Sequence, residues 1–424
     1  MKKWSRLIKI AIFGPLLCLL WLPDTAQAFP AFARTYQVPC STCHVVFTRR
    51  NEFGDAFRKN GYRWPGEPEY DKNAKNPAPI DMPGVSLWEG LLPTTWPFSA
   101  VMSFSGDHTT DPNAPQSFNV GSPGVKLLFG STLSDHLAVM GIWSPSGAPS
   151  EFVLQASRLF DRPELNIRIG KIEPTTTMFK TNEQMVSTFL LTSSNISGLT
   201  MGGPKLGAEL NGTVMGRIFY AAGTVKSNAN NGDQFNTYYH LSGRVGGTSF
   251  SGEEPDIDLD DPSFIDDVSF TLGHWGYFGS IAGSGGVSIS RVARFGLDAK
   301  IGIPEFELWG GVMLGIDHDM TKKIADEDGS GSSHHPEELH VTFFGEALWS
   351  ATSWLFPSYM FQFQDRASLS RPTQKHSLGV FFLPIENLRV SLVYNLESSD
   401  NADATLGKEG DYLGTGKAEI RMGF

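Results

Sequence analysis

An alternation of apolar and polar residues recurs from Trp96 to Phe424, and it constrains the fold more than any other feature of this sequence. Each unit is a stretch of about ten residues followed by a turn, which matches the length and period of strands that cross a membrane in a β-barrel. These strands fit either a water-soluble sandwich or a barrel with lipid outside and a polar lumen inside. The last unit is the clearest, since one face holds Gly416, Ala418, Ile420, Met422 and Phe424 and the other holds Lys417, Glu419 and Arg421.

Two features favour the barrel. The chain ends on the aromatic Phe424, as outer-membrane barrels typically do. Its connections also switch between tight turns and long polar loops, the pattern of short periplasmic turns and long outer loops. The tight turns lie near 134–135, 161–164, 302–305, 350–353 and 384–387, and the long loops near 106–118, 174–204, 226–234, 318–338, 364–374 and 397–411. We therefore predict an all-β transmembrane barrel of about sixteen antiparallel strands over residues 93–424, in contact with outer-membrane lipid and with both ends periplasmic.

One connection departs from this pattern. The segment 248–265 is long and acidic, yet strand parity assigns it to the periplasmic side. Either one strand is miscounted, or this is a periplasmic acidic loop that could receive a basic electron carrier.

Composition excludes several other architectures. The chain is 40% hydrophobic, 12% aromatic and only 19% charged, which is too apolar for a disordered protein. Three cysteines are too few for a disulfide-rich scaffold. Beyond the N-terminal segment, no apolar run approaches the roughly 20 residues of a membrane-spanning helix.

The first 28 residues have the features of a secretory signal peptide. Four basic residues precede and enter an apolar stretch that ends at Leu22, and Ala26-Gln27-Ala28 is a small-x-small cleavage site. Cleavage after Ala28 removes Cys18, four basic residues and Asp24, which leaves 30 basic and 44 acidic residues and a net charge of −14. That balance argues against a nucleic-acid partner.

The two remaining cysteines form the sharpest motif of the chain, Cys40-Ser41-Thr42-Cys43-His44. This is the C-x-x-C-H pattern of covalent haem attachment, in which two thiols bind the porphyrin and the adjacent histidine ligates the iron. We therefore predict one haem c, with His44 as the proximal iron ligand. The rival interpretations are a structural disulfide, a redox dithiol pair and half of a zinc site. A zinc site lacks a second cysteine pair, and a dithiol pair lacks the βαβ context.

The flanks of the motif predict a small helical haem domain with a linker, residues 29–92. A helix is expected over 51–60, with Phe53 and Phe57 on one face and Gly61 ending it. Arg34 is a candidate partner for a haem propionate. For the sixth iron ligand we consider Met82 first, with Met102, His108 and His136 as competitors and an open position as the remaining alternative.

The motif and its neighbours resemble the fused outer-membrane cytochrome–porins of iron-oxidising bacteria. The resemblance is carried by Phe32-Ala33-Arg34-Thr35-Tyr36 before the cysteines, and by Asn51-Glu52-Phe53-Gly54 and Phe57-Arg58-Lys59-Asn60-Gly61-Tyr62 after them. Arg50 stands where that family is expected to have leucine. The resemblance covers roughly thirty residues, while the barrel agrees in size and pattern.

The resemblance implies haem c on Cys40 and Cys43 with His44 as proximal ligand. It also implies oxidation of extracellular Fe(II) or another redox substrate, with electrons passed to a periplasmic electron-carrier cytochrome. Three alternatives stay open. Electrons could flow in the outward direction, or the chain could be a solute porin whose haem domain gates the pore or senses a signal. The third and least favoured is a peroxidase-like enzyme, which needs an open distal position and a nearby acid–base pair, because the haem segment contains no histidine besides His44.

Overall fold

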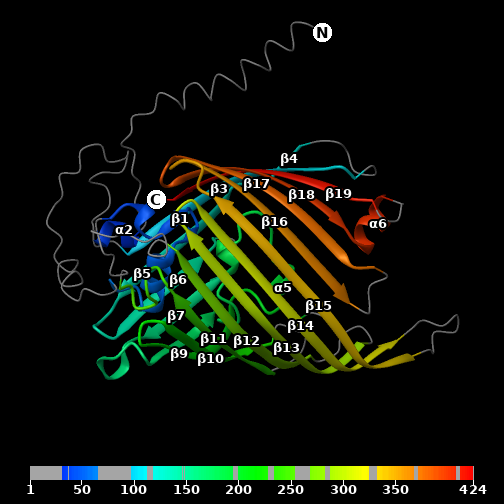
Figure 1. Cartoon of the computed structure of the whole chain (residues 1–424), viewed down its shortest axis with the longest axis horizontal. Helices are drawn as coiled ribbons and strands as arrows, with labels where there is room; N and C mark the ends of the chain where they lie inside the picture. The colour runs from blue at the N-terminus through cyan, green and yellow to red at the C-terminus, as the bar shows by residue number, and fades with distance from the viewer. Residues whose placement is uncertain are drawn as a thin grey trace, which may run out of the picture.

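Seventeen of the strands in the structure form one closed barrel (Figure 1). The computed structural model describes residues 31–36, 38–64, 97–111, 118–145, 147, 149–193, 199–227, 234–253, 268–281, 287–323, 332–366, 371–406 and 411–423. The predicted signal peptide and Met82 lie outside these residues.

The barrel consists of sixteen principal antiparallel strands in the described part of the chain, as the alternation predicts. The first strands are β3 (Phe98–Thr109), β5 (Gly124–Thr132), β6 (Leu137–Trp143), β7 (Glu151–Ala156), β8 (Asn166–Ile172), β9 (Lys205–Val214), β10 (Ile218–Lys226) and β11 (Phe235–Val245). The others are β12 (Ser269–Ile281), β13 (Val287–Ile303), β14 (Phe306–Lys323), β15 (Ser332–Trp349), β16 (Leu355–Arg366), β17 (Thr373–Ile385), β18 (Leu388–Ser398) and β19 (Leu413–Gly423). A two-residue strand, β4 (Asn119–Val120), pairs with β3, and β19 closes the barrel on β3 with Ile420 opposite Phe104.

The connections divide the barrel into two ends. We call the end with the short connections, such as 133–136, 215–217, 304–305 and 386–387, the tight-turn end, and the opposite end the long-loop end. The acidic connection of 248–265 joins β11 to β12 at the tight-turn end, so the predicted strand parity is correct. Most of its acidic residues lie outside the described part of the chain.

The two faces of the wall differ as the alternation predicts. Outward side chains are large, apolar and exposed, and include Ile169, Leu206, Leu210, Leu241, Leu297, Phe343, Leu392 and Ile420. Inward side chains on the same strands are mostly polar and buried, and include Arg168, Glu209, His240, Asp298, Thr342, Gln362 and Ser377. This apolar exterior is the surface that a barrel presents to lipid. No helix of the described residues is long and apolar enough to cross a membrane.

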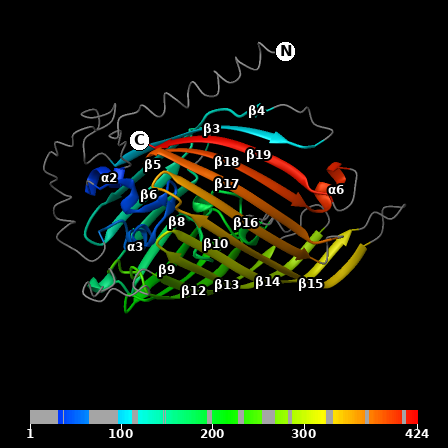
Figure 2. The same ribbon diagram turned by 45° about the horizontal axis from the view of Figure 1, so that its top comes forward.

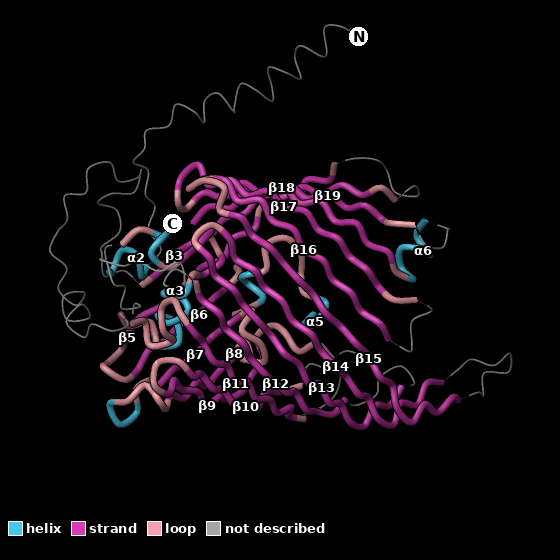
Figure 3. The backbone as a smooth tube through the Cα atoms, in the orientation of Figure 1, coloured by secondary structure: helices cyan, strands magenta, loops and turns pink. Residues whose placement is uncertain are grey.

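The connection between β8 and β9 folds into the barrel instead of extending outward as a polar loop. This inner loop, residues 173–204, contains the 3₁₀ helix η3 (Thr181–Glu183) and the short helix α5 (Leu190–Ser193). The loop lies inside the barrel, where α5 is enclosed by the strands (Figure 3). Its Phe189 ring stacks on Phe344 of β15 with centroids 4.2 Å apart. The amide of Leu190 donates to Gln362 Oε1 of β16 at 2.7 Å. Apolar side chains within the loop therefore gain burial by entering the lumen.

The N-terminal segment, residues 31–64 without residue 37, lies at the tight-turn end near β5 and β6 (Figure 2). It comprises α2 (Ala31–Tyr36), η1 (Cys40–Thr42), β1 (His44–Val46), β2 (Arg49–Arg50) and α3 (Glu52–Lys59). The predicted helix over 51–60 is confirmed: Asn51 caps it by accepting from the amide of Gly54 at 2.8 Å, and Gly61 follows with φ of +70°. The β1–β2 ribbon has no counterpart in the sequence-based expectation.

Charged groups attach this segment to the barrel. Arg49 forms a buried ion pair with Glu346 of β15 at 2.5 Å, and Arg50 pairs with Glu183 of the inner loop at 2.6 Å. The amide of Cys40 donates to Glu386 at 2.7 Å. The segment is thus fixed both to the wall and to the loop inside the lumen.

Candidate functional site

A cavity of about 260 Å³ lies between the N-terminal segment and the barrel wall. Cys40, Cys43 and His44 all line it, together with aromatic residues of α2 and α3 and with residues of β5 and β6. We call it the motif cavity. The three residues of the C-x-x-C-H motif that the sequence singles out therefore share one site.

The motif begins in a single tight turn. Cys40 lies in η1, and the amide of Cys43 donates to the carbonyl of Cys40 at 3.1 Å, which brings the two residues onto one turn of chain. The two thiols are not joined by a disulfide in the structure. Burial raises the pKa of Cys40 to about 12 and that of Cys43 to about 11, so both thiols are protonated near neutral pH.

His44 has the properties of a neutral ligand. Burial, reinforced by the positive charge of Arg50, lowers the pKa of its imidazole to about 4. Its Nδ1 is buried and has no hydrogen-bond partner. A neutral imidazole that lines the cavity and has an unpartnered ring nitrogen is suited to metal ligation.

Aromatic side chains form much of the cavity wall. Phe32 of α2 stacks on Tyr62 with ring centroids 5.0 Å apart, and it meets Phe57 of α3 edge-on at 5.3 Å. Tyr36 and Trp64 also line the cavity. This lining suits a large flat apolar group. Phe57 lies on the helix face that the sequence assigns to such a surface.

Gly54 lets α3 pack directly against the motif. A Cβ at this position would lie 2.1 Å from the carbonyl oxygen of Cys43, a distance that real Cβ atoms do not adopt. Asn51 adds a second link, because its side-chain nitrogen donates to the carbonyl of Thr42 at 2.9 Å. The N-x-F-G sequence thus has a local structural role, because it allows the N-terminus of α3 to pack against the turn that carries the two cysteines.

Three cations line the motif cavity: Arg50, Arg58 and Lys180. Arg50 is paired with Glu183, and the Lys180 ammonium donates to the carbonyl of Pro174 at 3.0 Å. Arg58, like Arg50, has a buried Nε without a hydrogen-bond partner. An arginine in this state is suited to bind an anionic group within the cavity. The sequence feature that could have identified Arg58 as a site residue is its position in the segment Phe57–Tyr62.

The backbone of Arg34 belongs to α2, but its side chain lies outside the described part of the structure, so its predicted propionate contact stays a prediction. The sixth-ligand candidates Met102, His108 and His136 are not among the residues that line the motif cavity. Met102 lies on the outward face of β3 with Phe104, two residues along the same strand. His136 lies in the turn before β6, where its Nδ1 is 3.3 Å from the carbonyl oxygen of Ser157.

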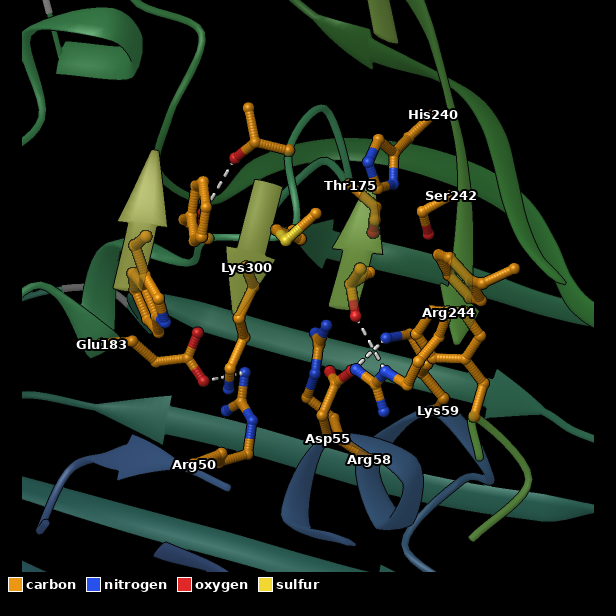
Figure 4. Close-up of a pocket in the computed structure, with 17 residues that line it drawn as sticks. Arg50, Asp55, Arg58, Lys59, Thr175, Glu183, His240, Ser242, Arg244 and Lys300 are labelled. Carbon is orange, nitrogen blue, oxygen red and sulfur yellow. Dashed lines mark hydrogen bonds and ion pairs between the residues drawn. The ribbon is translucent and has the colours of Figure 1, made fainter. Parts of the chain in front are cut away.

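On the other side of α3 is a charged cluster that surrounds a second, smaller cavity of about 30 Å³ (Figure 4). Asp55 pairs with Lys59 and lies 3.8 Å from the guanidinium of Arg244 on β11. Burial alone would raise the pKa of Asp55, but Lys59, Arg58 and Arg244 hold it well below its ordinary value. This cluster ties α3 to the wall.

Beyond the motif cavity, the inner loop fills part of the lumen. Phe179 of the inner loop stacks on Trp309 of β14 at 4.6 Å, and the Arg49 guanidinium lies 3.9 Å from the same indole ring. Towards the long-loop end, inward side chains are also buried, with Tyr277 at 0% and His340 at 1% exposure. These inward side chains of β12 and β15 are therefore packed against protein, whereas the inward-facing lysine of β19 is half-exposed.

The fold is that of outer-membrane porins. The anion-selective porin from Comamonas acidovorans matches with a TM-score of 0.55 and 10% sequence identity over 77% of this chain and 98% of that chain. OmpF of Salmonella typhi in complex with daunomycin matches with a TM-score of 0.52 and 10% identity over 77% and 97% of the two chains. The outer membrane channel DcaP of Acinetobacter baumannii matches with a TM-score of 0.51 and 9% identity over 77% and 96%. No protein-family model matches the sequence, and no curated protein matches it.

Proposed function

We propose that this chain is a monohaem electron conduit of the bacterial outer membrane. It takes electrons from an extracellular donor, with Fe(II) as the expected substrate, and delivers them to a periplasmic electron-carrier cytochrome. The observation that carries the proposal is the position of Cys40, Cys43 and His44 around one largely apolar cavity, in a barrel whose lumen is partly occupied by the inner loop.

The residues around the motif cavity fit a covalent haem. Cys40 and Cys43 are unbonded thiols on one turn, and His44 offers a neutral imidazole with an unpartnered nitrogen. Phe32 and Tyr62 provide a flat apolar surface, and Arg58 provides a cation for a propionate. Haem bound at these residues supplies a one-electron redox centre.

The protein inside the lumen favours a conduit over a solute pore. Open porins carry water and solutes through a polar, hydrated lumen. Here the inner loop and the N-terminal segment occupy part of that space, and the inward residues Thr342 and Gln362 are each 0% exposed. A bilayer's hydrocarbon layer of about 30 Å blocks charge movement, so a protein-filled barrel can hold a redox centre at this layer without a water-filled path for ions.

Strand topology gives the conduit a direction in space. In outer-membrane barrels the short turns are periplasmic and the long loops are extracellular. With this orientation the motif cavity opens near the periplasmic side, within reach of a soluble carrier. The donor would then act from the long-loop end, and the packed side chains of the lumen, such as Phe179 and Trp309, lie between the two.

Reconstitution in liposomes tests this function. Purified full-length protein is inserted into vesicles that enclose an oxidised cytochrome c, and Fe(II) is added outside. We expect reduction of the enclosed carrier with the native chain and none with Cys43→Ser, which cannot hold haem through both thiols. A Ser41→Ala variant serves as the matched control within the motif turn.

The alternatives give different results in the same vesicles. Reduction of an external acceptor by an enclosed reduced carrier, without the reverse reaction, would assign outward electron flow. Solute-driven vesicle swelling that is equal for the native chain and Cys43→Ser, with no reduction of the enclosed carrier by external Fe(II), would identify a porin in which haem is not the conducting element. Either outcome would refute inward electron transfer.

A further inference from the structure

The motif cavity contains one thioether among its described lining residues, that of Met140 on β6. Met140 projects inward, since it shares a strand face with Ala138, which is 0% exposed. It packs against the cluster of Tyr36, Phe57 and Tyr62. The barrel wall therefore presents a methionine to the same cavity as the C-x-x-C-H motif.

The neighbouring strands allow the N-terminal segment to approach Met140 closely. Met140 pairs with Gly130 of β5 and with Val153 of β7. Gly130 has no side chain to cover it, and a Cβ there would lie 2.4 Å from the ring of Phe32. The α2 aromatic thus lies directly on the wall beside Met140, and the glycine makes this approach possible.

Other potential iron ligands in the cavity are engaged elsewhere or have the wrong chemistry. Lys180 donates from its ammonium to backbone carbonyls and to Thr175 Oγ1 at 3.3 Å. The Tyr36 hydroxyl donates to the carbonyl of Tyr62 at 3.0 Å. His44 is the one histidine among the described lining residues, and it belongs to the motif itself.

We propose that Met140 supplies the second axial ligand of the haem iron from the barrel wall. This inference rests on the proposed haem site and assigns its iron a His44–Met140 ligand pair. Met/His ligation raises the reduction potential of a c-type haem, which favours acceptance of electrons from a weak reductant such as Fe(II). It also joins the N-terminal segment to the wall through the iron, so undocking of the segment costs a metal ligand.

The spectrum of the oxidised, detergent-extracted full-length protein tests this assignment. Native protein is expected to show the near-infrared charge-transfer band of thioether-ligated ferric haem. Met140→Leu should lose this band, bind added cyanide faster and have a lower midpoint potential. Met140→His should stay low-spin but change to a bis-imidazole signature. The matched control, Met102→Leu on the outward face of β3, should leave the spectrum and the potential unchanged.

Covalent haem content, measured on the same samples by the pyridine haemochrome assay, distinguishes failure of the proposed function from failure of the Met140 assignment. No covalent haem in the native chain would refute the proposed function. Covalent haem with an unchanged band in Met140→Leu would overturn the Met140 assignment alone. Loss of the band in Met82→Leu but not in Met140→Leu would also overturn it, and would assign the ligand to the segment after Trp64.

Discussion

The buried ion pair between Arg49 and Glu346 makes the docking of the N-terminal segment testable. Both side chains are 0% exposed, and their charged atoms are 2.5 Å apart. Glu307 lies 3.8 Å from the same guanidinium and also pairs with Lys300. The perturbation is Arg49→Met, which keeps much of the side-chain volume over Trp309 but removes the charge.

The expected magnitude follows from the charge that is left behind. Removal of one partner of a buried pair typically costs about 3–5 kcal/mol, because the other charge stays desolvated and uncompensated. Each 1.4 kcal/mol is about a tenfold change in an equilibrium, so the undocked population should rise roughly 100- to several-thousand-fold. In the double variant Arg49→Met/Glu346→Gln no charge is stranded, since Glu307 keeps Lys300, so most of this loss should be recovered.

Limited tryptic digestion of the detergent-extracted protein measures this population. Release of the peptide from Asn51 to Arg58 requires the segment to undock, and its rate follows the undocked population when docking is faster than cleavage. The matched control is Lys417→Met, which removes a half-exposed partner 3.9 Å from Glu419 and should change the rate only slightly. Equal release from Arg49→Met and Lys417→Met, or no recovery in the double variant, would refute the reasoning.

Three further outcomes follow from the same structure. Gly54→Ala should reduce covalent haem per folded barrel, measured by haem staining, because its Cβ would meet the Cys43 carbonyl at 2.1 Å; Gly345→Ala, where the space is open, should not. The lowered pKa of Asp55 means that its docking contribution is fully present above its ordinary pKa of 3.8 and is lost as pH falls below that value. Protection of the α3 amides, measured by hydrogen exchange and corrected for the intrinsic exchange rate at each pH, should therefore fall below about pH 4 in the native chain, and this step should be absent in Asp55→Asn. In planar bilayers, the full chain should conduct less current than an open porin of the same strand number, because the inner loop and the N-terminal segment occupy part of the lumen, and a comparable conductance would contradict that reasoning.

The barrel could be predicted from the sequence because successive side chains of a strand point to opposite faces. A strand with lipid on one face and a polar lumen on the other therefore alternates apolar and polar residues. The outward position of Ile420 and the polar face of Glu419 are readable from their neighbours alone. The inner loop could not be assigned in this way, since loop length indicates a side of the membrane but not a direction of folding. The sequence feature that indicates burial of this loop is the presence of Phe179 and Phe189 in a segment that loop length alone predicts to be a polar outer loop.

The candidate site combines residues that are adjacent in the sequence with residues that only the folded barrel brings together. Cys40, Cys43 and His44 are adjacent in sequence, so their grouping needs no knowledge of the barrel. Met140 reaches the cavity only because β6 lies beside α2 and α3, and no local pattern distinguishes it from a core methionine. Proximity to the motif in the sequence therefore does not identify Met140, which only the closed sheet brings to the cavity.

The size of the N-terminal segment explains why so much of its site comes from the barrel. A chain of fewer than about 40 residues rarely buries enough apolar surface to fold alone and usually needs a metal, a disulfide or a partner. In this segment, His44 pairs in register with Arg50, the neighbour of Arg49, so the Glu346 and Glu183 ion pairs fix the strand that carries the imidazole. The position of His44 is therefore set by charges of the wall and the inner loop as much as by the aromatic cluster around Phe57. It follows that a transplanted segment 31–64 would lose the geometry of its motif, even though every residue of the C-x-x-C-H sequence would be present.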